Sequence, residues 1–511
     1  MDRRRFLKLS AAGVGAAVVV GPYFRGKSFG AGFGDFPTGA GDARLPEANR
    51  AKNILEVFLY GGLSCWETLY LVEEFGRADD PDHPNEQFHT FPSSINSAMT
   101  ACGVPDLGGE VGQFFAQDAA GVDVKLGPFA YLVWNRPDLT ERMRLVVQKH
   151  LLEPHEAAVP QALTGRPVGQ PSAAGLGAHI QRYHGERADA GRKAPFSWVF
   201  ATGGLAGDNV SAAASTGMHP GAARPLLIKI DNAERFTELL ARGAVGDASE
   251  RARYDALMDV YIEQYRQRLR WNGEGEPVRS ARFNDLNQGV KVVKNVDAIA
   301  GVMTPELFDA RAGAACGQSS SFDVPGMSLN AARHLLTHPT EPARYVCVSD
   351  VGLYEASGGG GYDTHSANSF DTARNFNNML RNLLSIINGP GETDALKLSL
   401  DDTMIILNME FGRTPWAQDG GDGRNHHPYG YVTAFIGGPI TADQKGIHGN
   451  IRADGVAQAY ASPAENRAAA LLAMGIWPFS PEAFAVSDVR GATGEEDGAL
   501  AAIEHYLGYA R

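Results

Sequence analysis

The sequence Ile-Leu-Glu-Val-Phe-Leu-Tyr at residues 54–60 is followed directly by Gly61-Gly62. A largely apolar run of this length that stops at a glycine pair is typical of a central strand buried on both faces. Similar runs recur at residues 145–148, 226–230, 345–348, 403–409 and 432–436. They predict further core strands.

Segments with helical spacing lie between these runs. Residues 249–271 place Tyr254, Leu257, Tyr261 and other apolar side chains on one face, so we expect this helix to pack on another element. Ser462-Pro463 favours a helix start, because serine caps a helix and proline suits its first position. Strands that alternate with helices predict an α/β fold with a mostly parallel central sheet and helices on both faces.

The domain organisation expected from these patterns is one α/β domain over residues 51–511. The stretch from about 231 to 333 has helical patterns but no clear strand, so we expect a helical insertion or cap there. Residues 31–50 are rich in Gly, Ala and Pro and are expected to form a linker.

The amino terminus reads Arg3-Arg4-Arg5-Phe6-Leu7-Lys8 and continues into a weakly apolar run over residues 11–20. This pattern predicts a twin-arginine signal peptide over residues 1–30 and a periplasmic or extracellular protein. The apolar run is about half the length that a membrane-spanning helix needs, so we expect no permanent membrane span.

Composition and charge narrow the class of protein. The 511 residues are 44% hydrophobic and 21% charged, which is typical of a globular chain with a large core. The formal net charge of -13 makes nucleic acid an improbable partner. The four cysteines form no Cys-x-x-Cys pair, which argues against a zinc ribbon. An oxidising compartment permits a disulfide, whereas Cys347 in its apolar run is expected to be a buried free thiol.

Ligands of an open parallel sheet bind at the carboxyl ends of its strands, so polar residues just after the apolar runs are the candidates for a site. Ser64, Glu67 and Thr68 follow the first run, where a functional loop and a structural turn are equally open. Four glycines at 358–361 precede Asp363 and His365, a carboxylate and an imidazole that suit a divalent metal. A hydrogen-bonded turn is the alternative there.

Two further segments carry the remaining candidates. Glu410 directly follows the run at 403–409, and Arg413 could bind an anion or pair with that carboxylate. Arg424, His426 and His427 precede the run at 432–436. Adjacent histidines usually diverge, so one of the pair is expected to face a ligand. Together these clusters, with His448 as a weaker addition, predict a metal-centred site.

The motifs resemble those of a bacterial family called domain of unknown function 1501. They are Gly-Gly-x-Ser after the first strand, Gly-Tyr-Asp-Thr-His at 361–365, Glu-Phe-Gly-Arg-Thr-Pro at 410–415 and Gly-Arg-Asn-His-His-Pro at 423–428. That family is similar to the alkaline phosphatase and sulfatase superfamily. The resemblance implies one or two divalent metals, Zn, Mn, Mg or Ca, held by Asp363, His365, Glu410 and His426, and the histidine pair adds His427 as a candidate ligand. The resemblance places His155 at the nucleophile position.

The sequence also departs from the superfamily. No Cys-x-Pro-x-Arg is present, which excludes a formylglycine sulfatase. Phe411 stands where a metal-binding histidine is usual, Asn425 replaces an aspartate, and Glu67 replaces another. Two hypotheses therefore stay open: an exported metal-dependent hydrolase of a phosphate or sulfate ester, and a non-catalytic envelope protein that binds a surface polymer or a partner. In the first, His155 acts as nucleophile or base and Arg413 or Arg424 holds the anion.

Overall fold

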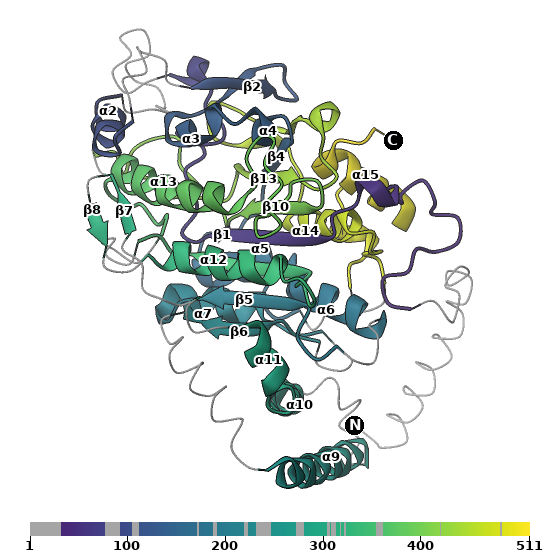
Figure 1. Cartoon of the computed structure of the whole chain (residues 1–511). Helices are drawn as coiled ribbons and strands as arrows, with labels where there is room; N and C mark the ends of the chain where they lie inside the picture. The colour runs from purple at the N-terminus through teal and green to yellow at the C-terminus, as the bar shows by residue number, and fades with distance from the viewer. Residues whose placement is uncertain are drawn as a thin grey trace, which may run out of the picture.

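A computed structural model gives the fold of the chain (Figure 1). It describes residues 32–76, 92–104, 112–170, 173–187, 192–218, 223–230, 247–271, 281–303, 307, 313–316, 318–320, 323–353, 361–418, 421–480 and 483–510. The expected signal peptide lies outside the described residues, as do the first three glycines of the run at 358–361. Residues 32–50, expected as a linker, form turns and the short 3-10 helix η1 (Glu47–Asn49), and bury Phe33 and Leu45.

The centre of the molecule is an eight-stranded sheet with the strand order β14-β4-β13-β10-β1-β9-β5-β6. Every pair of neighbours is parallel except for β13, which runs antiparallel to both β10 and β4. The α/β fold with a mostly parallel sheet is thus confirmed. The strands are β1 (Asn53–Leu59), β4 (Met143–Gln148), β5 (Ser197–Ala201), β6 (Leu226–Lys229), β9 (Tyr345–Asp350), β10 (Thr403–Asn408), β13 (Tyr431–Gly437) and β14 (Gly446–His448).

Both faces of β1 are buried, because alternate side chains of a strand point to opposite faces and helices cover each side. Leu55 and Val57 belong to the core beneath α12 (Val324–Leu336) and α13 (Asn368–Ile386). Ile54 and Phe58 belong to the core on the other face, with α5 (His155–Thr164) and α14 (Pro463–Ala473). Figure 1 shows α12 and α13 in front of the sheet.

The helix start expected at Ser462-Pro463 can be compared with the structure. Ser462 caps α14 by accepting a hydrogen bond from the backbone N–H of Glu465 at 3.1 Å, and Pro463 opens the helix, as expected. The chain forms a further helix beyond α14 that the sequence did not predict, α15 (Glu495–Leu507). The remaining helices are α2 (Pro92–Ala101), α3 (Tyr131–Trp134), α4 (Pro137–Thr140), α6 (Leu176–Arg187), α7 (Gly204–Ala214), α9 (Ala248–Trp271), α10 (Ala281–Lys294) and α11 (Val296–Val302).

The stretch expected to be a helical insertion or cap contains α9, α10 and α11, and also a small hairpin where the sequence shows no clear strand pattern. The hairpin pairs β7 (Gly313–Ala315) with β8 (Gln318–Ser320). Its three-residue strands are too short to show a periodicity. The expectation that the apolar face of α9 packs was only partly right, because Ile262 is buried whereas Tyr254 and Leu257 are exposed.

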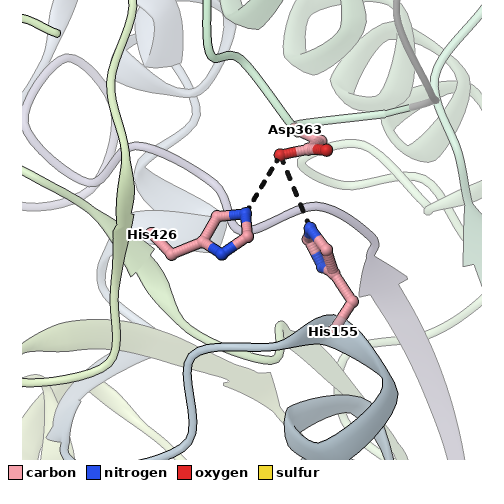
Figure 2. A group of neighbouring side chains, drawn as sticks. All are labelled: His155, Asp363 and His426. Carbon is pink, nitrogen blue, oxygen red and sulfur yellow. Dashed lines mark hydrogen bonds and ion pairs between the residues drawn. The ribbon is translucent and has the colours of Figure 1, made fainter.

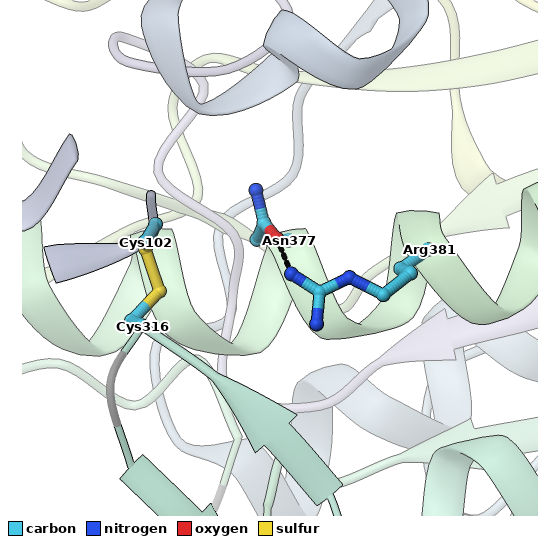
Figure 3. The surroundings of a disulfide bond; sticks show 4 residues. All are labelled: Cys102, Cys316, Asn377 and Arg381. Atoms are coloured by element: carbon cyan, nitrogen blue, oxygen red, sulfur yellow. Dashed lines mark hydrogen bonds between the residues drawn. A yellow bond between two sulfur atoms is a disulfide. The ribbon is translucent and has the colours of Figure 1, made fainter. Parts of the chain in front are cut away.

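A disulfide joins Cys102, just after α2, to Cys316, just after β7. Figure 3 shows the bond beside α13, on which Arg381 donates a hydrogen bond to Asn377. Cys65 and Cys347 are buried free thiols, so the expectation for Cys347 is confirmed. Within the described part of the chain, no helix combines the length and apolar character that crossing a bilayer requires.

Candidate metal site

The candidate residues meet at one edge of the sheet because of the strand directions. β1, β4, β9 and β10 are parallel to one another across the sheet, so their carboxyl ends share this edge. Glu410 follows β10, Asp363 lies beyond β9, and His155 opens α5 beyond β4. β13 runs the other way and begins at this edge, so His426, which precedes it, arrives at the same place.

Two imidazoles and a carboxylate converge there (Figure 2). Nε2 of His155 lies 3.5 Å from Oδ1 of Asp363, and Nε2 of His426 lies 3.4 Å from the same oxygen. The ligand atoms of these three residues all lie within 4.8 Å of one another, a spacing that could hold one metal ion. His365, which is more exposed, brings its Nε2 to 3.1 Å from Asp363 Oδ1 and 3.0 Å from His426 Nε2.

The ring of His155 is oriented by Glu410. Nδ1 of His155 donates to Oε1 of Glu410 at 2.8 Å, and the backbone N–H of Gly61 donates to the same oxygen at 2.7 Å. The other ring nitrogen, Nε2, is buried and has no hydrogen-bond partner. Metal-binding histidines commonly donate their second N–H to a carboxylate in this way, which turns the remaining nitrogen toward the ion.

The charges of the cluster are set by its neighbours. Burial acts to lower the pKa of His155, but the nearby carboxylates of Asp363 and Glu410 outweigh it and raise the pKa to about 9. Burial acts to raise the pKa of Asp363, yet His155, His426 and Arg413 together hold it far below its usual range. Burial lowers the pKa of His426. Asp363 is therefore an anion that attracts cations, with a proton on His155 when no metal is bound.

Arg413 lies within this site but faces away from solvent. Its Nη2 donates to Oδ1 of Asp363 at 2.5 Å, and the guanidinium also donates to the backbone carbonyls of Gly61, Gly62 and Arg424. The side chain is fully buried. Its contacts fix Asp363 and the loop after β1, which is a positioning role rather than the anion-holding role expected from the sequence.

Two other expected site residues lie apart from the cluster. Arg424 is fully buried and pairs with Glu67, whose other carboxylate oxygen accepts from Ser64. His427 points away from His426, as neighbours on a strand do, and its Nε2 bonds to the backbone oxygen of Gly455 at 2.8 Å. The role of His427 as a metal ligand and that of Arg424 as an anion holder are therefore not supported.

His448 also lies elsewhere. Its ring stacks on that of His505, with the ring centroids 3.7 Å apart. Thr68 donates to the backbone oxygen of Ser64, so both hydroxyls of the first candidate loop are engaged in the interior. The structural-turn alternative for that loop fits these contacts.

Several contributors to the site were missed in the sequence. Gln418 accepts a hydrogen bond from Nδ1 of His365 at 3.0 Å, which leaves Nε2 toward the cluster. Tyr60 and Phe411 pack against His155, with ring centroids 5.1 Å and 4.9 Å from its own. Phe411, already noted in the sequence, thus forms an apolar wall beside His155. The end of the first apolar run pointed to Tyr60, but no local pattern singled out Gln418.

The fold and the cluster define an α/β protein with a candidate metal site at the carboxyl edge of its sheet. Residues 305–476 match the model of a family described as "Protein of unknown function (DUF1501)". The match confirms, for this part of the chain, the family resemblance drawn from the motifs. It includes Asp363, His365, Glu410 and His426, whereas His155 lies before it. No curated protein and no solved structure matches the chain.

Proposed function

We propose that the protein binds a divalent metal ion through His155, Asp363 and His426. The observation that carries the proposal is the buried Nε2 of His155, which has no hydrogen-bond partner and lies 3.5 Å from the Asp363 carboxylate. The contact of this nitrogen with Asp363 is an ion pair without a hydrogen bond, and a cation between the two groups would bind both. His365 is a fourth ligand within reach.

The types of side chain that would bind the ion indicate which metal is preferred. Two or three imidazoles with one carboxylate suit Zn or Mn, whereas Mg and Ca prefer sites built from oxygen. The neighbours of the proposed ligands support the same choice, because Glu410 binds Nδ1 of His155 and Gln418 binds Nδ1 of His365.

We further propose that the site serves the hydrolysis of a phosphate or sulfate ester outside the cytoplasm. A divalent ion at this position would supply Lewis-acid chemistry to an ester oxygen. Tyr60 and Phe411 exclude water from the inner side of the cluster, and the more exposed His365 marks the outer side. His155 fits a ligand better than the nucleophile or base, because both of its ring nitrogens are directed at carboxylates. Export by the twin-arginine route is part of this proposal, and the disulfide is compatible with it.

The second candidate is a non-catalytic envelope protein that keeps a metal for stability and binds a surface polymer or a partner protein. The observation in its favour is the burial of both expected anion holders. Arg413 and Arg424 are fully buried and bonded to carboxylates and backbone carbonyls, so neither side chain is open to a substrate anion.

The test has a binding arm and an activity arm. We expect His426→Ala to lower zinc or manganese affinity by more than about 100-fold, because it removes a direct ligand. His427→Ala is the matched control, since its ring bonds to Gly455 outside the cluster, and it should bind metal as the wild type does. Equal affinity in both variants, with the fold intact by circular dichroism, would contradict the metal site.

The activity arm separates the two candidates. Phosphate monoesters, phosphate diesters and sulfate esters are offered to the metal-loaded protein with and without chelator. Turnover that chelator abolishes and that His426→Ala removes supports the hydrolase. Tight metal binding with turnover of none of these esters supports the binding protein instead.

A further inference from the structure

The helix α9 presents a row of apolar side chains to solvent. Tyr254, Leu257, Val260 and Tyr261 are each more than half exposed. Figure 1 shows α9 at the lower edge of the molecule, with α10 as its labelled neighbour. Exposed apolar side chains that cluster on one element, rather than scatter singly, usually mark a contact surface.

This row is not the face that folds α9 onto the protein. Ile262 and Tyr265 form a small core with Phe283 and Val290 of α10. Lys294 of α10 pairs with Asp259. The helix therefore has one apolar face that packs within the chain and a second face that no described residue covers.

The exposed row carries opposite charges at its two ends. Glu250 and Arg268 are both exposed and lie eighteen residues apart, which is about five helical turns, so they share the side of Leu257 and Tyr261. Among the described residues, neither side chain has an ion-pair partner. Glu250 thus gives one end of the row an acidic side chain, with Arg253 on its flank, and Arg268 gives the other end a basic one.

The pattern is symmetric about the middle of the row. Leu257 lies seven residues after Glu250, and Tyr261 lies seven residues before Arg268. If a second α9 lies antiparallel across the first, Leu257 of each copy meets Tyr261 of the other. Glu250 of each copy then meets Arg268 of the other. A surface that matches itself under a twofold rotation is the requirement for a closed dimer.

We propose that α9 is a dimerisation helix and that the exposed row binds the same row of a second copy of this chain. A lipid surface fits less well, because helices that lie on membranes carry mainly Lys and Arg on the polar face. Acidic and basic residues are nearly balanced on α9, with Glu250, Asp255, Asp259 and Glu263 against Arg251, Arg253, Arg266, Arg268 and Arg270. The inference is independent of the metal site.

The test is a charge exchange read by sedimentation velocity on the mature protein over a wide range of concentrations. Glu250→Arg and Arg268→Glu, each alone, place like charges at both ends of the dimer and should raise its dissociation constant by about tenfold. The two changes together restore opposite charges and should recover the wild-type constant. Leu257→Asp should leave a monomer.

Controls exclude effects of folding and of general surface polarity. Leu205→Asp changes an exposed apolar residue on α7 and should leave the dimer unchanged. All the variants should keep the wild-type circular dichroism. A wild-type protein that stays monomeric throughout, or a dimer that Leu257→Asp leaves intact, overturns the proposal. A monomer that sediments with phosphatidylglycerol vesicles and loses this on Leu257→Asp would replace the second copy with a lipid surface.

Discussion

Metal binding by this protein should depend steeply on pH, because the ion and a proton compete for Nε2 of His155. Its pKa is about 9 when no metal is bound. At pH 7, two units lower, only about 1% of these rings are neutral, which weakens the apparent affinity about 100-fold. We therefore expect zinc or manganese affinity to rise about tenfold per pH unit from pH 7 to pH 9 and then to level off.

Glu410→Gln should change the dependence of metal affinity on pH. The amide oxygen can still accept from Gly61 and His155, so the shape of the site is kept. Loss of the negative charge lowers the pKa of His155, so the affinity of the variant should level off at a lower pH. Loss of the carboxylate that holds the His155 ring should also weaken binding above pH 9 by about 10-fold.

Isothermal titration calorimetry in buffers of different ionisation enthalpy measures the metal affinity and the number of protons released on binding. The wild-type protein should release about one proton per ion at pH 7, and Glu410→Gln should release fewer. Glu153→Gln is the control, because this carboxylate bonds Tyr429 rather than a proposed ligand. A wild-type affinity that is flat between pH 7 and pH 9 would refute the reasoning, as would an unchanged profile in Glu410→Gln.

Three predictions concern stability. Arg467→Met should cost about 3–5 kcal/mol in urea denaturation, because it leaves the carboxylate of Glu56 buried without its cation, and an unchanged midpoint would argue against this. Burial lowers the pKa of His179 to about 3, so its stabilising contribution is complete above about pH 6.5 and falls by about 1.4 kcal/mol per unit as the pH drops toward 3. His179→Gln should remove that part of the acid sensitivity, which acid titrations of both proteins will measure. Replacing Cys102 and Cys316 by serine should destabilise the protein by about 2–5 kcal/mol, and a calorimetric Tm equal to that of the wild type would disagree.

Strands β1, β9, β10 and β13 could be found from the sequence because every residue of each strand is buried, so each strand appears as an apolar run. The run at 54–60 became β1 at Asn53–Leu59, and the run at 403–409 became β10 at Thr403–Asn408. β5 was missed although all five of its residues are buried, since its apolar run, from Trp198 to Ala201, is short. The antiparallel direction of β13 was not predicted, because strand direction depends on the connections between distant segments.

The position of the candidate site could be predicted from the sequence, but the role of each of its residues could not. Carboxylates and histidines after buried strands pointed to the correct edge of the sheet. Which of two adjacent histidines faces inward depends on the local strand geometry, and only the structure shows that His426 does. Glu410 directly follows a strand, which is where a metal ligand was expected. Its hydrogen bond with Nδ1 of His155 shows instead that it orients that ring. Residues that orient a ligand without contacting the metal are placed by tertiary packing and leave no local sequence pattern.

An anomalous scattering measurement on crystals of the mature protein soaked in zinc or manganese would examine the central claim most directly. The account predicts a single strong peak about 2.0–2.2 Å from Nε2 of His155, an oxygen of Asp363 and Nε2 of His426. A map with no peak at that position, while the three side chains keep the arrangement described above, would contradict it.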